Sequence, residues 1–146
     1  MYAIADGEVT WAKDGSPDAP PGQVLKGLNS VMIRHANGET SQYAHLKQGS
    51  VTVQKGDRVR AGQMIGRVGN SGQSGTPHLH FSVDAGTIEE LRVPDNMGYP
   101  RQTLGQSVPF YFDDFRLERV GDTRCNIRVV RGRPQEGWTM VFSEPE

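Results

Sequence analysis

The stretch Thr76-Pro-His-Leu-His-Phe-Ser-Val83 combines β-forming residues with a His-x-His pair. Side chains alternate between the two faces of a β-strand, so His78 and His80 are expected on one face and Leu79 and Phe81 on the other. We therefore expect two imidazoles that face a cleft, and an apolar side of the strand that packs on a core.

This His-x-His pair suits metal chemistry. Imidazole is a good zinc ligand, and its unperturbed pKa of about 6.5 also lets it move protons near neutral pH. One histidine of the pair can bind a metal while the other transfers a proton. The alternative is that both are ordinary surface histidines, and an isolated His-x-His does not decide between the two interpretations.

Length and composition limit the possible functions. A chain of 146 residues has the length of one domain, and its 18 glycines favour short strands and tight turns over helices. The formal net charge is −1 with interspersed acids and bases, which argues against a nucleic-acid partner. The single cysteine, Cys125, excludes an intrachain disulfide and a cysteine zinc cage. No apolar run approaches the roughly 20 residues of a transmembrane helix, and no signal peptide precedes Tyr2.

The first part of the chain predicts strands joined by loops. Tyr2 to Trp11 alternates around a glycine and reads as a strand with a turn or bulge at Asp6-Gly7, whereas the proline-rich segment 13–28 reads as a surface loop. Residues 30–35 and 39–46 alternate around Asn37-Gly38, which is a strong hairpin signal.

In the second arm of this hairpin we expect Ser41, Tyr43 and His45 on one face, provided that the strand stays regular to its end. Residues 49–68 then predict short extended pieces bent at glycines, and 69–75 is a loop of small residues that is either a flexible turn or a close approach to a ligand. The expected core residues of 49–68 are Val51, Val53, Val59, Ile65 and Val68.

The remaining sequence gives weaker signals. Residues 87–91 can form one helical turn, and 94–106 reads as irregular. The aromatic run 108–120 predicts core and an edge strand, and 125–130 with 138–142 predicts a final hairpin.

Several ordered motifs together resemble one known family. They are Tyr43-Ala-His45-Leu, Val53-x-x-Gly-Asp-Arg-Val-x-x-Gly-Gln-x-Ile-Gly66, and Gly69-Asn-Ser-Gly-x-Ser-Gly-Thr-Pro-His78-Leu-His80-Phe. The chain closely resembles the lysostaphin-type zinc peptidases, which cut peptide cross-bridges of bacterial cell walls. The resemblance implies an all-β, mostly antiparallel domain like a barrel-sandwich hybrid, with a groove. We assign residues 1–84 to this domain, N-terminally incomplete, and 85–146 to a loop-rich C-terminal extension packed on it.

The resemblance also implies roles for individual histidines. His80 matches the zinc ligand of the His-x-His motif, and His45 and His78 match the two catalytic histidines. His35 matches a position that has no assigned chemical role in the family, and we expect it to pack or to support other residues. The resemblance does not identify substrate-binding residues.

The sequence departs from the family in one respect. The family's zinc is also held by a His-x-x-x-Asp motif, which lies shortly before the segment that matches Tyr2 to Gly7, and this chain begins after that point. We therefore expect a truncated product that retains little zinc after dialysis. The nearby acids do not have the spacing of substitute ligands and are expected to be turn or surface residues; they are Asp6, Asp14, Asp18 and Asp84.

Three functions remain open from the sequence. The resemblance favours a zinc-dependent peptidoglycan endopeptidase that acts on wall peptides in an extracytoplasmic location, that is, periplasm, cell envelope or outside the cell. A degenerate member would instead bind the wall or a partner without cutting. A third alternative is a biotinyl or lipoyl carrier domain, because Gly56 to Gly66 is similar to those domains, but none of the four lysines has the setting of a carrier lysine.

Overall fold

The described part of the chain is built from β-strands. The computed structural model describes residues 1–85, 89–91, 101–103, 106–107, 112–119, 122–132 and 138–142, with side chains as far as residue 85. None of these residues is helical, which confirms the all-β expectation. Within the same ranges, no helix has the length and hydrophobicity to cross a membrane. The chain divides into two compact units, Met1–Val108 and Pro109–Glu146.

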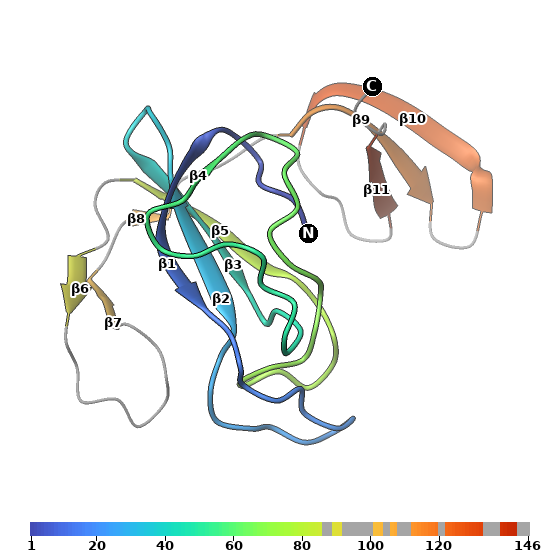
Figure 1. Ribbon diagram of the computed structural model, residues 1–146. Coiled ribbons are helices and arrows are strands. Elements are labelled where there is room, and N and C mark those ends of the chain that lie inside the picture. The colour runs from blue at the N-terminus through green and yellow to red at the C-terminus, as the bar shows by residue number, and fades with distance from the viewer. Residues whose placement is uncertain are drawn as a thin grey trace. The chain divides into compact units, whose positions relative to one another are not determined.

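The first unit contains a six-stranded antiparallel sheet with the strand order β4-β1-β2-β3-β5-β8 (Figure 1). Its strands are β1 (Gly7–Lys13), β2 (Ser30–Arg34), β3 (Glu39–Ala44), β4 (Arg58–Val59), β5 (His80–Ala85) and β8 (Gln106–Ser107). A separate pair is formed by β6 (Glu89–Leu91) and β7 (Arg101–Thr103). The expected helical turn at 87–91 is therefore wrong for the residues of β6, and the expected irregular segment 94–106 contains a strand.

The hairpin between β2 and β3 forms where the sequence predicted it. Gly38 has a φ of 83°, and the Asn37 side chain accepts a hydrogen bond from the backbone N–H of Glu39 at 3.1 Å. This combination closes the tight turn, because glycine adopts positive φ without steric cost. The first strand begins later than predicted, at Gly7, and its irregularity lies between Val9 and Trp11.

The core lies on one face of this sheet. Residues from the segments before β1 and after β3 complete it. Its buried cluster consists of Ala3, Val9, Val31, Ile33, Tyr43, Leu46, Val59 and Ile65. Two predicted core positions are wrong: Val68 is 46% exposed and Leu79 is 40% exposed. Phe81 packs against the core as expected, with its ring centroid 5.2 Å from that of Tyr43.

His35 joins the N-terminal segment to the sheet. Its Nδ1 atom lies 2.9 Å from the carbonyl oxygen of Asp6, and its Nε2 atom lies 2.8 Å from Ser41 Oγ. The neighbouring Tyr43 hydroxyl lies 3.3 Å from Ser41 Oγ and accepts the backbone N–H of Ile4 at 2.9 Å. His35 therefore has the packing role that the sequence predicted.

Three of the four candidate acids hold loops together. The Asp14 carboxylate accepts backbone N–H groups of Gly49 and Val51 at 2.8 and 3.0 Å, and Asp6 accepts that of Ala61 at 2.8 Å. Asp18 likewise accepts backbone N–H groups, so these three acids are the turn residues that the sequence predicted. Asp84 is buried rather than at the surface, and it accepts a hydrogen bond from a serine of its own strand.

The second unit is a three-stranded antiparallel sheet. The central strand is β9 (Phe112–Arg119), and β10 (Asp122–Gly132) and β11 (Trp138–Phe142) pair with it on either side. Two expectations are therefore wrong: β9 is not an edge strand, and β10 does not form a hairpin with β11. The pairing of β5 with β8 extends the first compact unit to Val108. That the peptidase-like domain ends at residue 84, and that residues 85–146 form an extension packed on it, stays a prediction.

Candidate metal centre

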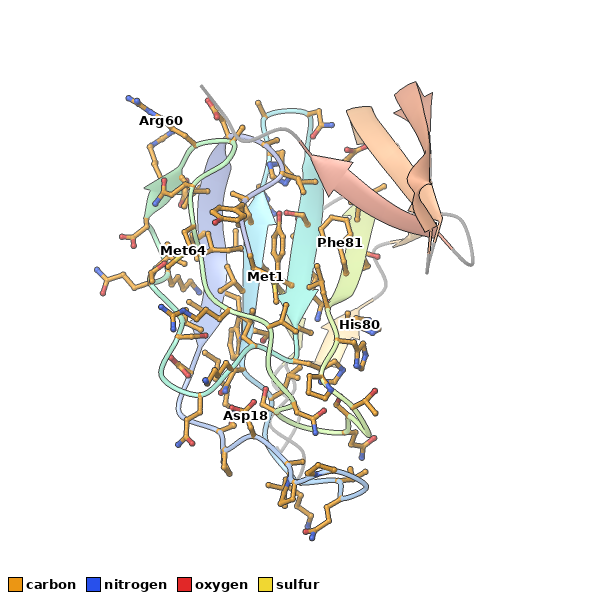
Figure 2. The ribbon with its side chains drawn as sticks, turned by 90° about the vertical axis from the view of Figure 1, so that its right-hand side faces the viewer. Met1, Asp18, Arg60, Met64, His80 and Phe81 are labelled. Atoms are coloured by element: carbon orange, nitrogen blue, oxygen red, sulfur yellow. The ribbon has the colours of Figure 1, made fainter. Side chains whose placement is uncertain are left out.

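Strand pairing brings two of the candidate histidines together. His80, the first residue of β5, pairs with Ala44, the last residue of β3, so that His45 follows directly beside it. Figure 2 shows His80 at the start of β5, next to Phe81. The predicted strand 76–83 is wrong at its beginning, because β5 starts at His80 and His78 lies in the connection before it.

The three rings nevertheless gather in one place. The ring centroid of His45 lies 4.8 Å from that of His78 and 5.8 Å from that of His80. One nitrogen from each ring lies within 4.8 Å of the other two, and His45 is buried while the other two are exposed. Within residues 1–85, no other group of three His, Cys, Asp or Glu side chains meets this condition. Among the described residues, the three histidines therefore form one cluster, in which the buried His45 ring lies on the protein side and the His78 and His80 rings are open to solvent.

His45 adopts an unusual backbone conformation. Its φ is 59°, and it is the single non-glycine residue with positive φ in the described part of the chain. The strand consequently ends at Ala44, and the predicted common face of Ser41, Tyr43 and His45 does not extend to His45. The backbone on both sides is fixed, because the His45 carbonyl accepts the N–H of Gly69 at 2.9 Å and the next residue donates to Asn29 at 3.1 Å. Such conformations cost about 1–3 kcal/mol and concentrate at functional sites.

The His45 ring has one defined tautomer. Its Nδ1 atom lies 2.7 Å from the carbonyl oxygen of Ser71. A carbonyl can only accept, so Nδ1 carries the proton and Nε2 is free to act as a base or ligand. Burial lowers the pKa of His45 below its usual value; the Ser71 bond opposes this shift, and His78 and His80 add to it. The ring is therefore neutral at neutral pH.

His78 is held in the same way. Its Nδ1 atom lies 2.8 Å from the carbonyl oxygen of Thr76 and 3.2 Å from Ser74 Oγ. The carbonyl again requires a proton on Nδ1, which leaves Nε2 unprotonated in the neutral ring. His80 contacts His45 edge-on, with an interplanar angle of 87°.

The loop 69–75 supports two of these rings. Asn70, Ser71 and Ser74 are buried, and the chain around them is fixed by hydrogen bonds rather than flexible. Sequence reasoning left open whether this loop is a simple turn and did not single out its serines. Their position between glycines, directly before the His-x-His, was the available signal.

The donor set of the cluster fits zinc. Imidazole nitrogens are common zinc ligands, and tetrahedral zinc with bonds of about 2.0–2.1 Å places its ligand atoms roughly 3.3 Å apart. The nitrogens lie within 4.8 Å of one another, which is wider than this spacing, so the rings would have to turn for all three to contact one ion. Asp84 does not contribute, because four residues along a strand separate it from His80 by about 13 Å.

A family model covers the part of the chain that contains the histidine cluster, and several known proteins are similar in sequence to this chain. The model of peptidase family M23 matches residues 1–90. DD-carboxypeptidase/endopeptidase Mpg of Neisseria meningitidis is 53% identical over 55 residues, which cover 38% of this chain and 12% of that protein. Peptidoglycan DD-endopeptidase ShyA of Vibrio cholerae is 42% identical over 84 residues, which cover 55% and 19% of the two chains.

A third relative is named for a different activity. Murein hydrolase activator EnvC of Escherichia coli is 38% identical over 84 residues, which cover 57% of this chain and 17% of that protein. The chain thus spans less than a fifth of the length of each of these three relatives.

Proposed function

The chain belongs to peptidase family M23, and on this basis we propose that the protein is a zinc-dependent endopeptidase that hydrolyses peptide cross-links of bacterial peptidoglycan. The observation that carries the proposal is the convergence of His45, His78 and His80 from two separate segments. The relatives Mpg and ShyA, both named as endopeptidases, support the same reaction class.

We assign His80 as the zinc ligand contributed by β5. Its ring is exposed at the start of the strand, where an ion has access from solvent. A zinc ion held there would supply polarisation of the peptide carbonyl and a bound water with a pKa of about 7, which is a nucleophile at neutral pH.

We assign His45, rather than His78, as the general base. Its Nε2 atom is unprotonated because Nδ1 donates to Ser71, and its lowered pKa keeps it so at neutral pH. Nε2 would accept a proton from the attacking water as its oxygen bonds to the carbonyl carbon, and would return that proton to the amine that leaves when the C–N bond breaks. His78 faces the same space and is the second ring placed to orient the water and to stabilise the oxyanion of the tetrahedral intermediate.

The location and partner follow from the substrate. Peptidoglycan lies outside the cytoplasmic membrane, so the protein acts in the periplasm, in the cell envelope or outside the cell. Its partners are the peptides of the wall. Membership of family M23 also accounts for the sequence of Gly56 to Gly66 without a carrier domain.

The second candidate function is a module that binds the wall or a partner without cutting. The similarity to EnvC, which is named as an activator of murein hydrolases, favours it. The two candidates differ in a measurable way, because a binding module needs no general base and its binding should survive the loss of His45.

The proposal is tested with a His80→Ala variant and purified peptidoglycan. We expect zinc binding and release of soluble wall peptides both to fall to background. His35→Asn is the matched control, since it also removes one histidine, but one that bonds to Asp6 and Ser41 rather than lying in the cluster. If His80→Ala leaves both zinc binding and hydrolysis unchanged, the assignment is wrong.

A further inference from the structure

The geometry points to Asn70 and Ser74 as positioning residues: we propose that they hold His78 as the tautomer protonated at Nδ1 and so direct its Nε2 atom into the histidine cluster. The inference rests on the proposed function only for the catalytic role of His78. The arrangement itself is a group of hydrogen bonds that links Asn70, Ser74 and Thr76 to His78.

The chain begins at the Asn70 side chain, which is buried at 3% exposure. Its Nδ2 atom donates to the carbonyl oxygen of Ala19 at 2.9 Å, and its backbone N–H donates to the Asp18 carboxylate at 2.6 Å. Because a carbonyl can only accept, the amide cannot be flipped without losing this bond. The Oδ1 atom of Asn70 is therefore the atom that faces Ser74.

Ser74 is the next link and is also buried. Its Oγ atom lies 2.7 Å from Asn70 Oδ1 and 2.8 Å from the carbonyl oxygen of Thr76. Both of these atoms are acceptors, so the single hydroxyl proton points to one of them and not to His78. The lone pairs of Ser74 Oγ then face His78 Nδ1 at 3.2 Å, which must be the donor.

Ser74 is one of two residues that contact His78 Nδ1. It is one acceptor for Nδ1–H, and the Thr76 carbonyl, which lies 2.8 Å from both Nδ1 and Ser74 Oγ, is the second acceptor. His78 itself is exposed, so burial does not fix its ring. The orientation of the ring consequently depends on these contacts, and removal of the Ser74 hydroxyl should leave Nδ1–H with one acceptor in place of two and weaken the preference for this tautomer.

Ser71 provides a matched control in the same loop. Its side chain is fully buried and makes two hydrogen bonds, accepting from the N–H of Asn29 and donating to the carbonyl of Leu46. Ser71→Ala removes these bonds but no contact with His78. This variant therefore shows how the loss of buried hydrogen bonds in the loop affects the His78 ring when its own contacts are intact.

The experiment is long-range ¹H–¹⁵N correlation NMR of the imidazoles in metal-free protein, which distinguishes the two neutral tautomers. We expect His78 to be protonated at Nδ1 in the unaltered protein. In Ser74→Ala and Asn70→Ala we expect a mixture of tautomers, whereas Ser71→Ala should keep the Nδ1–H signal. With zinc and peptidoglycan, Ser74→Ala should lower kcat about 10–100-fold without lowering the zinc content.

Either of two results overturns the inference. The first is an Nε2–H tautomer of His78 in the unaltered protein, which requires no variant and so does not depend on whether Ser74→Ala folds. The second is an unchanged His78 signal in a folded Ser74→Ala protein. Neither measurement uses metal or substrate, so the inference can fail while the peptidase function stands, and a protein without hydrolytic activity can still show the predicted tautomer.

Discussion

The Nδ1 atom of His45 lies 2.7 Å from the carbonyl oxygen of Ser71, so a ring at the end of β3 is oriented by a loop 26 residues further along the chain. The same loop also contacts His78 through Ser74. Two of the three clustered histidines therefore depend on one backbone segment, and a change in the path of the loop should disturb both rings together.

Gly69→Ala tests this dependence. A Cβ atom at Gly69 would overlap the backbone of Lys47 and the carboxylate of Asp18, so the loop must move. We expect a loss of about 1–3 kcal/mol in the free energy of unfolding, together with a large loss of hydrolysis. Gly75→Ala is the matched control, because nothing lies within 4 Å of its Cβ position, and it should behave like the unaltered protein. Urea unfolding and hydrolysis assays measure both; full activity in Gly69→Ala would show that the loop does not position the rings.

His45→Asn separates chemistry from metal binding. Asparagine tolerates the positive φ of 59° at this position better than most residues, so the fold should persist. We expect hydrolysis to fall about 10²- to 10⁴-fold, as for the loss of a general base, while zinc content stays the same. Elemental analysis alongside the activity assay decides the matter: simultaneous loss of zinc would make His45 a ligand or a structural residue.

The lowered pKa of His45 predicts a pH dependence of stability. Burial, its largest cause, makes the folded protein take up the proton at lower pH than the unfolded chain does. Between the lowered pKa and about 6.5 the unfolded chain binds more protons, so the free energy of unfolding should rise with pH through this window. Below the lowered pKa, both states bind the proton, and the full cost of burying the charged His45 ring lowers the free energy of unfolding.

Urea unfolding from about pH 5 to pH 8 with a chelator present measures this slope. His45→Asn should flatten the part of the slope that lies in the window, because the only group removed is the ring that faces His78 and His80. Identical slopes for the two proteins would contradict the assignment of a depressed pKa to His45.

Tyr43→Phe tests the core network around His35. Tyr43 is 1% exposed, and its hydroxyl accepts the N–H of Ile4. Removal of this acceptor should lower the free energy of unfolding by about 1–2 kcal/mol. Tyr2→Phe removes the same hydroxyl from a residue that is 62% exposed and should change stability by less than about 0.5 kcal/mol. Equal effects in urea unfolding would mean that the buried hydroxyl has no stabilising role.

The sequence predicted the hairpin from a local signal, and it predicted the clustered histidines from the resemblance of several ordered motifs to one family. Asn37-Gly38 sets a turn by its own backbone preference, whereas the place of the His78 ring depends on its contacts with Thr76 and Ser74 as well as on its spacing from His80. The left-handed conformation of His45 could not be predicted, because it is imposed by hydrogen bonds to Gly69, Asn29 and Ser71, which are distant in sequence.

The incorrect predictions have a similar cause. Leu79 is apolar and belongs to an alternating run, but the strand begins only at His80, so no sheet neighbour covers it. Residues 125–130 and 138–142 do alternate and are strands, yet their partner is β9, because strand order depends on contacts that no local pattern records.

Titration of metal-free protein with zinc, followed through the imidazole signals in NMR, tests the central claim most directly. The account predicts that the signals of His80, as the ligand, and of His45 and His78, as its neighbours, change over the same range of zinc concentration, while His35, which bonds to Asp6 and Ser41, stays unchanged. Independent responses of the three rings, or a response of His35 instead, would show that the three rings do not surround one metal site.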